Sequence, residues 1–397
     1  MAKNQHPVLL KCVPSFLIAR PARGTPEISQ ARHGPLTIAG LFRTASGVGR
    51  SARACADALN ALSLNPVHVD LSAMFGQVDM EAEHSLRRMP LDMMGTLMLH
   101  LNAPETTLAL KALGLFRPRR WRVIGHWVWE LERMPPEQTR VSRHLTEIWA
   151  PSTFVRNAIA SSVSIPVKVV PYYLRVPSNL RPERARFSLK DDEIAVLSMA
   201  DGRSSLTRKN LIGSIRVFLA AVGDRPNCRL ILKTRNLGIH ERAAEDVLAA
   251  VRHHKQMTLI DRPLSSRDTL SLIRSCDIFL SLHRAEGFGL TMAEAMALGK
   301  PVIATGWSGN MDFMCEDTAA IVPYRFVPVV DASDIYESAS EARWAEPDER
   351  LATQILTGLL DNPERRRRLG ACATAAIVKR LSAENYRIAL GDEADPI

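Results

Sequence analysis

Short apolar runs recur along the chain, and each is followed by a loop and then by a segment of helix-forming composition. In the first half these runs cover residues 36–42, 67–71, 97–101, 122–127, 148–150 and 167–170. In the second half they cover residues 194–199, 229–233, 257–261, 278–282 and 302–305. Parallel strands need crossover connections, usually helices, and are buried on both faces, so this alternation predicts an α/β chain with parallel sheets wrapped by helices.

A proline-rich stretch divides this alternating pattern into two halves. It contains Pro171, Pro177 and Pro182 and leads into the polar run Lys190-Asp-Asp-Glu193. At 397 residues the chain is long enough for two domains that each bury a core. We therefore expect an N-terminal extension over residues 1–34, a Rossmann-like domain over 35–178 and a second Rossmann-like domain over 179–380, before a final segment over 381–397.

Cysteine usage and hydropathy limit the classes of protein to which this chain can belong. The six cysteines form no Cys-x-x-Cys pair, and no histidine cluster has zinc spacing, so we expect free thiols in a reduced, cytoplasmic chain without a metal domain. No N-terminal signal pattern is present, and no apolar run reaches the roughly 18 residues that a membrane span needs. We therefore expect a protein that is neither secreted by that route nor integral to a membrane.

The formal net charge of +9 indicates an anionic partner. No nucleic-acid module with interleaved aromatic residues is recognisable, so a phosphorylated substrate and an anionic membrane surface are favoured over nucleic acid. Residues 113–122 combine apolar side chains with four arginines and are one candidate for peripheral contact with the inner face of the cell membrane. A solvated loop leading into a strand is an equally good interpretation of this segment.

Two glutamates frame a glycine-containing turn in the second half. Glu286 follows the apolar run 278–282, and Glu294 falls about one turn into a segment of helix-forming composition that ends near Gly299. Glycines in the turn allow a ligand to approach the backbone, the helix N-terminus favours phosphate, and carboxylates accept hydrogen bonds from sugar hydroxyls. A nucleotide-sugar offers phosphates and vicinal hydroxyls together.

This order, Glu286, Gly287-Phe288-Gly289, Glu294 and then Gly299-Lys-Pro-Val, resembles the retaining glycosyltransferases of family 4 (group 1). The resemblance extends from about residue 36 to 385. It implies the GT-B fold, in which two Rossmann-like domains face a central cleft and the last helix crosses back onto the first domain. It also implies that Glu286 contacts the donor sugar, that Glu294 binds the ribose diol, and that Gly287, Phe288, Gly289 and Leu290 complete the donor site.

Basic residues follow the apolar run 194–199. Ligands of open α/β sheets bind beyond the carboxyl ends of strands, which is where Arg203 and Lys209 would lie. The resemblance implies that these two cations bind the donor diphosphate and stabilise it as a leaving group. Lys233, at the end of the next run, is another candidate phosphate contact.

A glycine-rich loop follows the first apolar run. By the resemblance, Gly47 and Gly49 lie near the donor phosphates, and Arg50 is assigned to the acceptor. The alternative is a dinucleotide fingerprint, Gly47-x-Gly49-x-x-Ala52, with Asp70 at the spacing expected for a ribose-binding acid. That alternative predicts an NAD-dependent oxidoreductase, and a tight turn without any ligand is a third interpretation.

The run from Val123 to Pro135 resembles the acceptor side of a bacterial subgroup of these enzymes. On that basis His126 is a candidate contact of the transferred sugar, grouped with the catalytic residues Glu286, Arg203 and Lys209, and Glu130 is a candidate acceptor contact. Beyond the glutamate pair, His283 and Asn310 are further donor-side candidates. Each of these residues could equally be structural. Tyr172 departs from the family pattern, in which a histidine or small polar residue is common at this place.

The resemblance therefore implies a cytoplasmic, retaining hexosyltransferase that moves a sugar from a UDP-, GDP- or dTDP-linked donor to a saccharide or lipid-linked acceptor. We expect a role in bacterial polysaccharide or lipopolysaccharide assembly. No cofactor and no metal are expected, because the chain has no Asp-x-Asp pair and its cations can hold the diphosphate. Another GT-B enzyme, such as a nucleotide-sugar epimerase, and a non-catalytic scaffold are the remaining alternatives.

Overall fold

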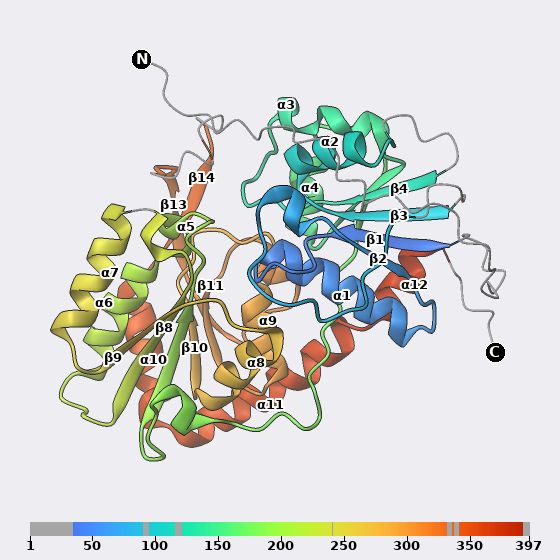
Figure 1. Ribbon diagram of the computed structural model, residues 1–397. Helices are drawn as coiled ribbons and strands as arrows, with labels where there is room; N and C mark the ends of the chain where they lie inside the picture. The colour runs from blue at the N-terminus through green and yellow to red at the C-terminus, as the bar shows by residue number, and fades with distance from the viewer. Residues whose placement is uncertain are drawn as a thin grey trace.

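The computed structural model describes residues 35–89, 95–115, 121–239, 241–331, 336 and 341–391 (Figure 1). The expected N-terminal extension, residues 116–120 of the candidate membrane patch and the last six residues lie outside the described residues. Two α/β domains lie side by side in Figure 1, and the green-to-orange second domain also includes most of the red C-terminal helices.

The first domain is built on a parallel sheet that, in the described ranges, has the strand order β2-β1-β3-β4-β5-β6. Its strands are β1 (Leu36–Gly40), β2 (Val67–Asp70), β3 (Gly95–His100), β4 (Trp121–His126), β5 (Glu147–Ala150) and β6 (Val167–Val169). The crossover segments contain α1 (Gly47–Ala61), η2 (Ser72–Phe75), α2 (Ala103–Ala112), α3 (Pro136–Thr139), η3 (Arg140–His144) and α4 (Thr153–Ala160). Continuous burial along β1 and β5 agrees with their apolar sequences.

The second domain repeats this architecture with the strand order β12-β11-β10-β7-β8-β9, also parallel throughout the described residues. Its strands are β7 (Ile194–Met199), β8 (Cys228–Thr234), β9 (Met257–Asp261), β10 (Ile278–Ser281), β11 (Val302–Thr305) and β12 (Ala320–Val322). Its helical segments are η4 (Arg184–Phe187), α5 (Leu206–Lys209), α6 (Leu211–Val222), η5 (Leu237–Ile239), α7 (Glu241–His253), α8 (Ser266–Ser275), α9 (Leu290–Ala297), η6 (Gly309–Asp312), α10 (Glu349–Asp361) and α11 (Pro363–Arg380). The predicted runs correspond to strands β1 to β11, and the predicted α/β class is confirmed.

The chain returns to the first domain in its last helix, α12 (Glu384–Leu390). Tyr386 of this helix packs edge-on against Trp149 of β5, with ring centroids 5.9 Å apart, and Arg122 donates a hydrogen bond to the carbonyl of Leu390 at 3.0 Å. Figure 1 shows α12 beside α1, at the far end of the red α11. Helix α12 follows the second domain in the chain but packs in an apolar cluster with residues of the first domain. It therefore links the two domains.

A small antiparallel ribbon was not among the sequence predictions. It is formed by β13 (Tyr324–Pro328) and β14 (Arg343–Pro347) and projects beyond the second sheet. Trp344 of β14 is buried, and the guanidinium of Arg343 lies 4.2 Å from the ring centre of Phe326. Arg343 also pairs with Glu132 of the first domain at 3.0 Å. The ribbon thus contacts both domains on one side of the region between them.

Candidate active site

A cavity of about 540 Å³ lies between the two domains. It is lined by loops that follow the carboxyl ends of β1 and β4 in the first domain and of β7, β8 and β10 in the second. This is where ligands bind in open α/β sheets. The predicted site residues that line it are Gly47, Arg50, Glu130, Arg203, Lys209, Lys233, Glu286, Gly287, Phe288, Gly289, Leu290 and Glu294.

Glu286 sits in the turn between β10 and α9 and has two cationic partners. Nζ of Lys209 donates to its Oε1 at 2.5 Å, and a guanidinium nitrogen of Arg208 lies 3.5 Å from the same oxygen. Burial by itself would raise the pKa of Glu286, but Lys209 and Arg208 outweigh it and lower the pKa to about 2. Glu286 is therefore a fixed anion at the edge of the cavity.

The turn that carries Glu286 is held in place from behind by the loop after β11. Ser308 accepts a hydrogen bond from the Glu286 amide at 2.8 Å, and the Gly309 amide donates to the Glu286 carbonyl at 2.9 Å. A Cβ atom on Gly309 would lie 2.1 Å from the carbonyl oxygen of Gly287, so the close approach of these two backbones requires glycine. From the first domain, Ser152 donates to the same Gly287 carbonyl at 2.6 Å.

Glu294 lies in the second turn of α9 and is fully buried. One carboxylate oxygen pairs with Arg50, which α1 of the first domain projects across the cavity. The other oxygen, Oε2, has no hydrogen-bond partner among the described residues. Burial raises the pKa of Glu294, and the opposing influence of Arg50 and Arg53 does not cancel it. An unpartnered buried carboxylate oxygen at a cavity wall suits a ligand hydroxyl.

Arg203 belongs to a charged network at the ends of β7 and β8. One of its guanidinium nitrogens lies 3.8 Å from Oδ1 of Asp79, a residue of the first domain. Arg235 bridges Asp79 and Asp201, each at 2.5 Å. Neither Asp79 nor Arg235 was predicted from the sequence; Asp79 lies in an irregular segment with no motif around it. The network places several cations where a diphosphate could bind.

Lys233 ends β8 and lines the cavity, but its amino group points into protein. It donates to the carbonyls of Thr234 and Arg262 at 2.6 and 2.7 Å. Burial lowers its pKa to about 8, and the neighbouring Arg235 contributes in the same direction. With its amino group held by two carbonyls, Lys233 supports the floor of the site, and its assignment as a phosphate contact stays a prediction.

The glycine-rich loop opens α1, whose N-cap Ser46 accepts a hydrogen bond from the Gly49 amide at 3.2 Å. Gly47 faces the cavity, whereas Gly49 packs against the backbone of Thr44. The carboxylate of Asp70 accepts hydrogen bonds from the amide and hydroxyl of Ser72 and does not line the cavity. The dinucleotide alternative needs that carboxylate for a ribose, so the geometry does not favour it.

His126 lies outside the cavity lining, in a buried stack. Its ring stacks on His100 and on Tyr172, with centroids 4.7 and 5.3 Å away, and its Nδ1 lies 3.3 Å from the Ser51 hydroxyl. Burial lowers its pKa to about 3. Tyr172, which departs from the family pattern, lines the cavity, whereas His126 does not. The role of His126 as a sugar contact stays a prediction.

His283 and Asn310 are brought together behind the glutamate turn. Nε2 of His283 lies 3.1 Å from the Asn310 side-chain oxygen, and Asn310 donates to the Thr305 carbonyl at 3.0 Å. Both residues are fully buried and neither lines the cavity. Their position indicates support of the Ser308–Gly309 loop, and direct donor contact stays a prediction for both.

Glu130 forms a cluster with Arg208 and Tyr336, neither of which was predicted from the sequence as a site residue. Arg208 is buried, donates to the Ala285 carbonyl at 2.6 Å and lies 3.7 Å from Glu130. Burial alone would lower the pKa of Arg208, but Tyr336 and the carboxylates of Glu130 and Glu286 outweigh it and raise the pKa. The Tyr336 hydroxyl donates to the other Glu130 oxygen at 3.3 Å. Arg208 adjoins Lys209 in sequence, but only the folded loop reveals which cation is buried.

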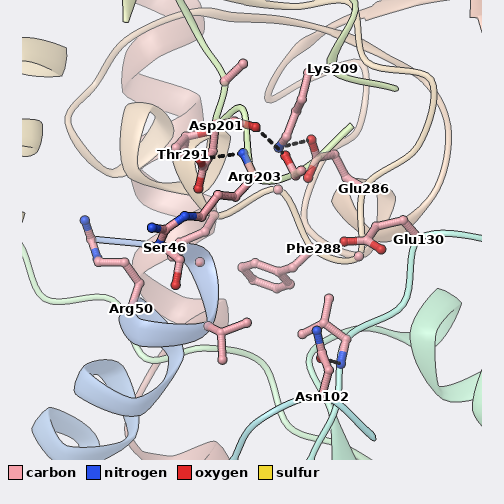
Figure 2. A pocket seen from close by; sticks show the side chains of 18 of the residues that line it. Ser46, Arg50, Asn102, Glu130, Asp201, Arg203, Lys209, Glu286, Phe288 and Thr291 are labelled. Carbon is pink, nitrogen blue, oxygen red and sulfur yellow. Dashed lines mark hydrogen bonds and ion pairs between the residues drawn. The ribbon is translucent and has the colours of Figure 1, made fainter. Parts of the chain in front are cut away.

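Figure 2 shows how these residues divide the cavity. Arg50, Ser46 and Arg203 lie on one side of Phe288, and Glu130 and Asn102 lie on the other, while Lys209 and Glu286 lie together above.

Over the described residues, no cluster of three or more histidine, cysteine, aspartate or glutamate side chains has the arrangement of a metal site. Nor does any helix in these ranges have the length and apolar character needed to cross a membrane.

Comparison with known proteins finds a family similarity within the second domain. Residues 186–326 match the family described as glycosyl transferases group 1. No curated protein sequence matches the chain significantly. The match confirms the resemblance to group 1 glycosyltransferases, while the narrower assignment to family 4 and to bacteria stays a prediction.

Solved structures with the same fold share little sequence with this chain. HepE from Anabaena, in complex with UDP-glucose, has a TM-score of 0.63 at 14% identity, with 90% of this chain and 99% of that chain covered. Sucrose-phosphate synthase from Thermosynechococcus elongatus has a TM-score of 0.63 at 15% identity, covering 90% and 97%. TarM from S. aureus has a TM-score of 0.55 at 10% identity, covering 75% of this chain and only 54% of TarM. These similarities confirm the predicted GT-B fold.

Proposed function

Because residues 186–326 match the group 1 glycosyltransferases and the fold is GT-B, we propose that this protein transfers a sugar from a nucleotide-sugar donor to an acceptor. The observation that carries the proposal is that Glu286, Glu294, Arg203 and Lys209 line one interdomain cavity. These residues combine two carboxylates for hydroxyl groups with two cations for phosphates.

The donor would lie along the second-domain wall. Glu294 would hold the ribose diol through its unpartnered Oε2, and Arg203 with the start of α9 would face the diphosphate. Glu286 would accept hydrogen bonds from hydroxyls of the transferred sugar, with Lys209 between that sugar and the phosphates. Arg50, now paired with Glu294, would have to share or give up this carboxylate when the ribose binds.

We propose that transfer retains the anomeric configuration. The bond from the anomeric carbon to the diphosphate oxygen breaks as the acceptor oxygen attacks from the same face, and the acceptor proton passes to an oxygen of the leaving diphosphate. Arg203 and Lys209 would stabilise the negative charge that develops on the leaving group, without a metal or cofactor. Glu286 is tied to Lys209 and Arg208, which suits it to orienting the sugar better than to attacking the anomeric carbon.

Two structural neighbours, HepE and TarM, have been solved in complex with UDP, which makes UDP-sugars the first donors to test. A role in bacterial polysaccharide or lipopolysaccharide assembly at the inner face of the cell membrane remains part of the proposal. So does a lipid-linked acceptor.

The experiment is a nucleotide-release screen of the full chain against UDP-, GDP- and dTDP-sugars, with and without glycoside acceptors. Proton NMR of the product then gives the anomeric configuration. Release of nucleotide with formation of a retained glycosidic bond is expected, and Glu286→Ala and Glu294→Ala should each abolish most of it. An inverted product would overturn the retaining mechanism, an epimerised nucleotide-sugar would indicate the epimerase alternative, and full activity in both variants would overturn the site.

A further inference from the structure

The first-domain wall of the cavity differs in chemistry from the second-domain wall. Of the described residues that the first domain contributes to this lining, Arg50 is the one cation, and it lies at the glycine-rich loop on the donor side. The rest of its lining combines two carboxylates, three amides and apolar side chains. These residues include Gln77, Asn102, Glu105, Val128, Trp129, Glu130, Met134 and Gln138. Of these, Asn102 and Glu130 lie on the other side of Phe288 from Arg50 in Figure 2.

Glu130 is oriented at this wall by two groups that hold both of its oxygens. A guanidinium nitrogen of Arg208 lies 3.7 Å from Oε1, and the Tyr336 hydroxyl donates to Oε2 at 3.3 Å. Each carboxylate oxygen can accept more than one hydrogen bond, so both retain capacity for a ligand. The Tyr336 ring is itself fixed edge-on against Trp129, at 5.8 Å, and Trp344, at 6.0 Å. Glu130 is thus a preorganised hydrogen-bond acceptor.

The neighbouring side chains complete a polar surface of hydrogen-bonding groups. Asn102 accepts a hydrogen bond from the Val128 amide at 3.0 Å through its side-chain oxygen, which leaves its amide nitrogen available as a donor. Oε2 of Glu105 is buried at the cavity and has no partner among the described residues. Trp129 and Met134 provide apolar area of the kind that packs against the C–H faces of a sugar ring.

We propose that this wall is an acceptor subsite for a neutral saccharide unit, whose hydroxyl groups are recognised by Glu130, Glu105 and Asn102. This proposal rests on the proposed transfer reaction. A phosphate group at the same place would face Glu105 and Glu130, and the described first-domain lining offers no cation there to neutralise it, since Arg50 lies at the glycine-rich loop. Arg208 does not provide that cation, because it is buried and already lies between Glu130 and Glu286. The group that receives the sugar is therefore a hydroxyl of a neutral sugar and not one beside a phosphate ester.

Arg208 also gives this subsite a direct connection to the donor. It contacts Glu286, the proposed donor-sugar carboxylate, at 3.5 Å and Glu130, the proposed acceptor carboxylate, at 3.7 Å. Arg208 acts as a positioning residue that fixes the distance between the two sugars. Arg208→Lys would keep the charge but cannot span both carboxylates with a planar fork, so it should reduce kcat more than it raises either KM.

The test is saturation-transfer NMR of the full chain with UDP present, using neutral methyl glycosides on one side and glucose 6-phosphate and glycerol 3-phosphate on the other. Neutral glycosides should receive saturation and the phosphorylated compounds should not. Glu130→Gln should weaken this contact, and in turnover assays it should raise the acceptor KM about tenfold, with a smaller change in the donor KM. Glu245→Gln, on the exposed side of α7, is the matched control.

Two failures can be told apart. If no nucleotide-sugar is turned over, the proposed function fails, and the NMR comparison still decides whether neutral glycosides occupy the wall. If a donor is turned over but only phosphorylated acceptors accelerate release, the neutral-saccharide subsite is wrong and the transferase activity stands. Absence of contact with every neutral glycoside would likewise overturn the subsite.

Discussion

Nζ of Lys209, at the end of α5, lies 2.5 Å from Oε1 of Glu286, in the turn after β10. The pair joins the end of α5 to the turn after β10, across 77 positions of the chain, and both residues line the same cavity. Arg208 contacts the same carboxylate, so Glu286 has an ionic partner even when Lys209 binds phosphate. The Lys209–Glu286 ion pair thus links the proposed diphosphate contact of the donor to its proposed sugar contact.

Replacement of Lys209 should impair catalysis more than folding. Lys209→Ala removes a cation from the proposed leaving group, and losses of about 10²- to 10³-fold in kcat are typical when one such stabilising group is deleted. The melting temperature should fall only slightly, because Arg208 still pairs with Glu286. Steady-state kinetics and thermal denaturation measure the two effects. Lys255→Ala, an exposed control, should change neither, and a kcat equal to wild type in Lys209→Ala would remove Lys209 from the reaction.

Acid should weaken the contribution of Glu286 to stability. Its pKa falls from 4.5 to about 2 on folding, so the folded state is stabilised above pH ~4.5 and loses that stabilisation as pH falls toward 2. Glu286→Gln lacks this titration. Urea unfolding at about pH 7 and about pH 3 should therefore show the difference in unfolding free energy between wild type and Glu286→Gln becoming smaller at the lower pH. A difference that is independent of pH would mean that the Glu286 pKa is not depressed.

The two glycines of the α1 loop should respond differently to alanine. A Cβ on Gly49 would lie 2.2 Å from the Thr44 carbonyl oxygen, so Gly49→Ala should destabilise the protein by about 1–3 kcal/mol. Nothing lies within 4 Å of a Cβ on Gly47, so Gly47→Ala should fold with unchanged stability. Since Gly47 lines the cavity, its new methyl group should raise the donor KM. Equal melting temperatures for the two variants would contradict this assignment.

The ion pair between Arg50 and Glu294 predicts non-additive effects on stability. Arg50→Ala leaves a buried carboxylate without its partner, which costs about 1–3 kcal/mol. Adding Glu294→Gln removes the buried charge, so the double variant should recover part of that loss. Chemical denaturation of the four proteins of this cycle measures the coupling. Strictly additive changes would show that Arg50 does not hold Glu294 in solution.

Much of the fold follows from local sequence. Buried parallel strands read as apolar runs because both faces are covered, and strands β1 to β11 were predicted on that basis. The β13–β14 ribbon was missed because its partners are separated by a long connection and its two strands are only partly buried. Trp344, which anchors the ribbon, has no local pattern that distinguishes it from an exposed tryptophan.

Residues that lie in recognisable sequence motifs could be predicted to line the cavity, whereas residues without a motif could not. Glu286, Glu294, Arg203 and Lys209 lie in motifs of the second domain, and all four line the cavity. Asp79 and Tyr336 come from segments without a motif, and their roles depend on contacts across the cavity. His126 was predicted as a site residue, and its strand was predicted as well, but its side chain packs behind Tyr172 and does not line the cavity.

The central claim is that the second domain binds a nucleotide-sugar through Glu294, Arg203 and Lys209. Calorimetric titration of the full chain with UDP, GDP, dTDP and their sugars tests it most directly, together with Glu294→Ala and the exposed control Lys255→Ala. One nucleotide should bind wild type and Lys255→Ala with the same affinity and bind Glu294→Ala at least about tenfold more weakly, as expected when a buried hydrogen-bonding group is lost. Absence of binding to every nucleotide, or equal affinity in Glu294→Ala, would contradict the claim.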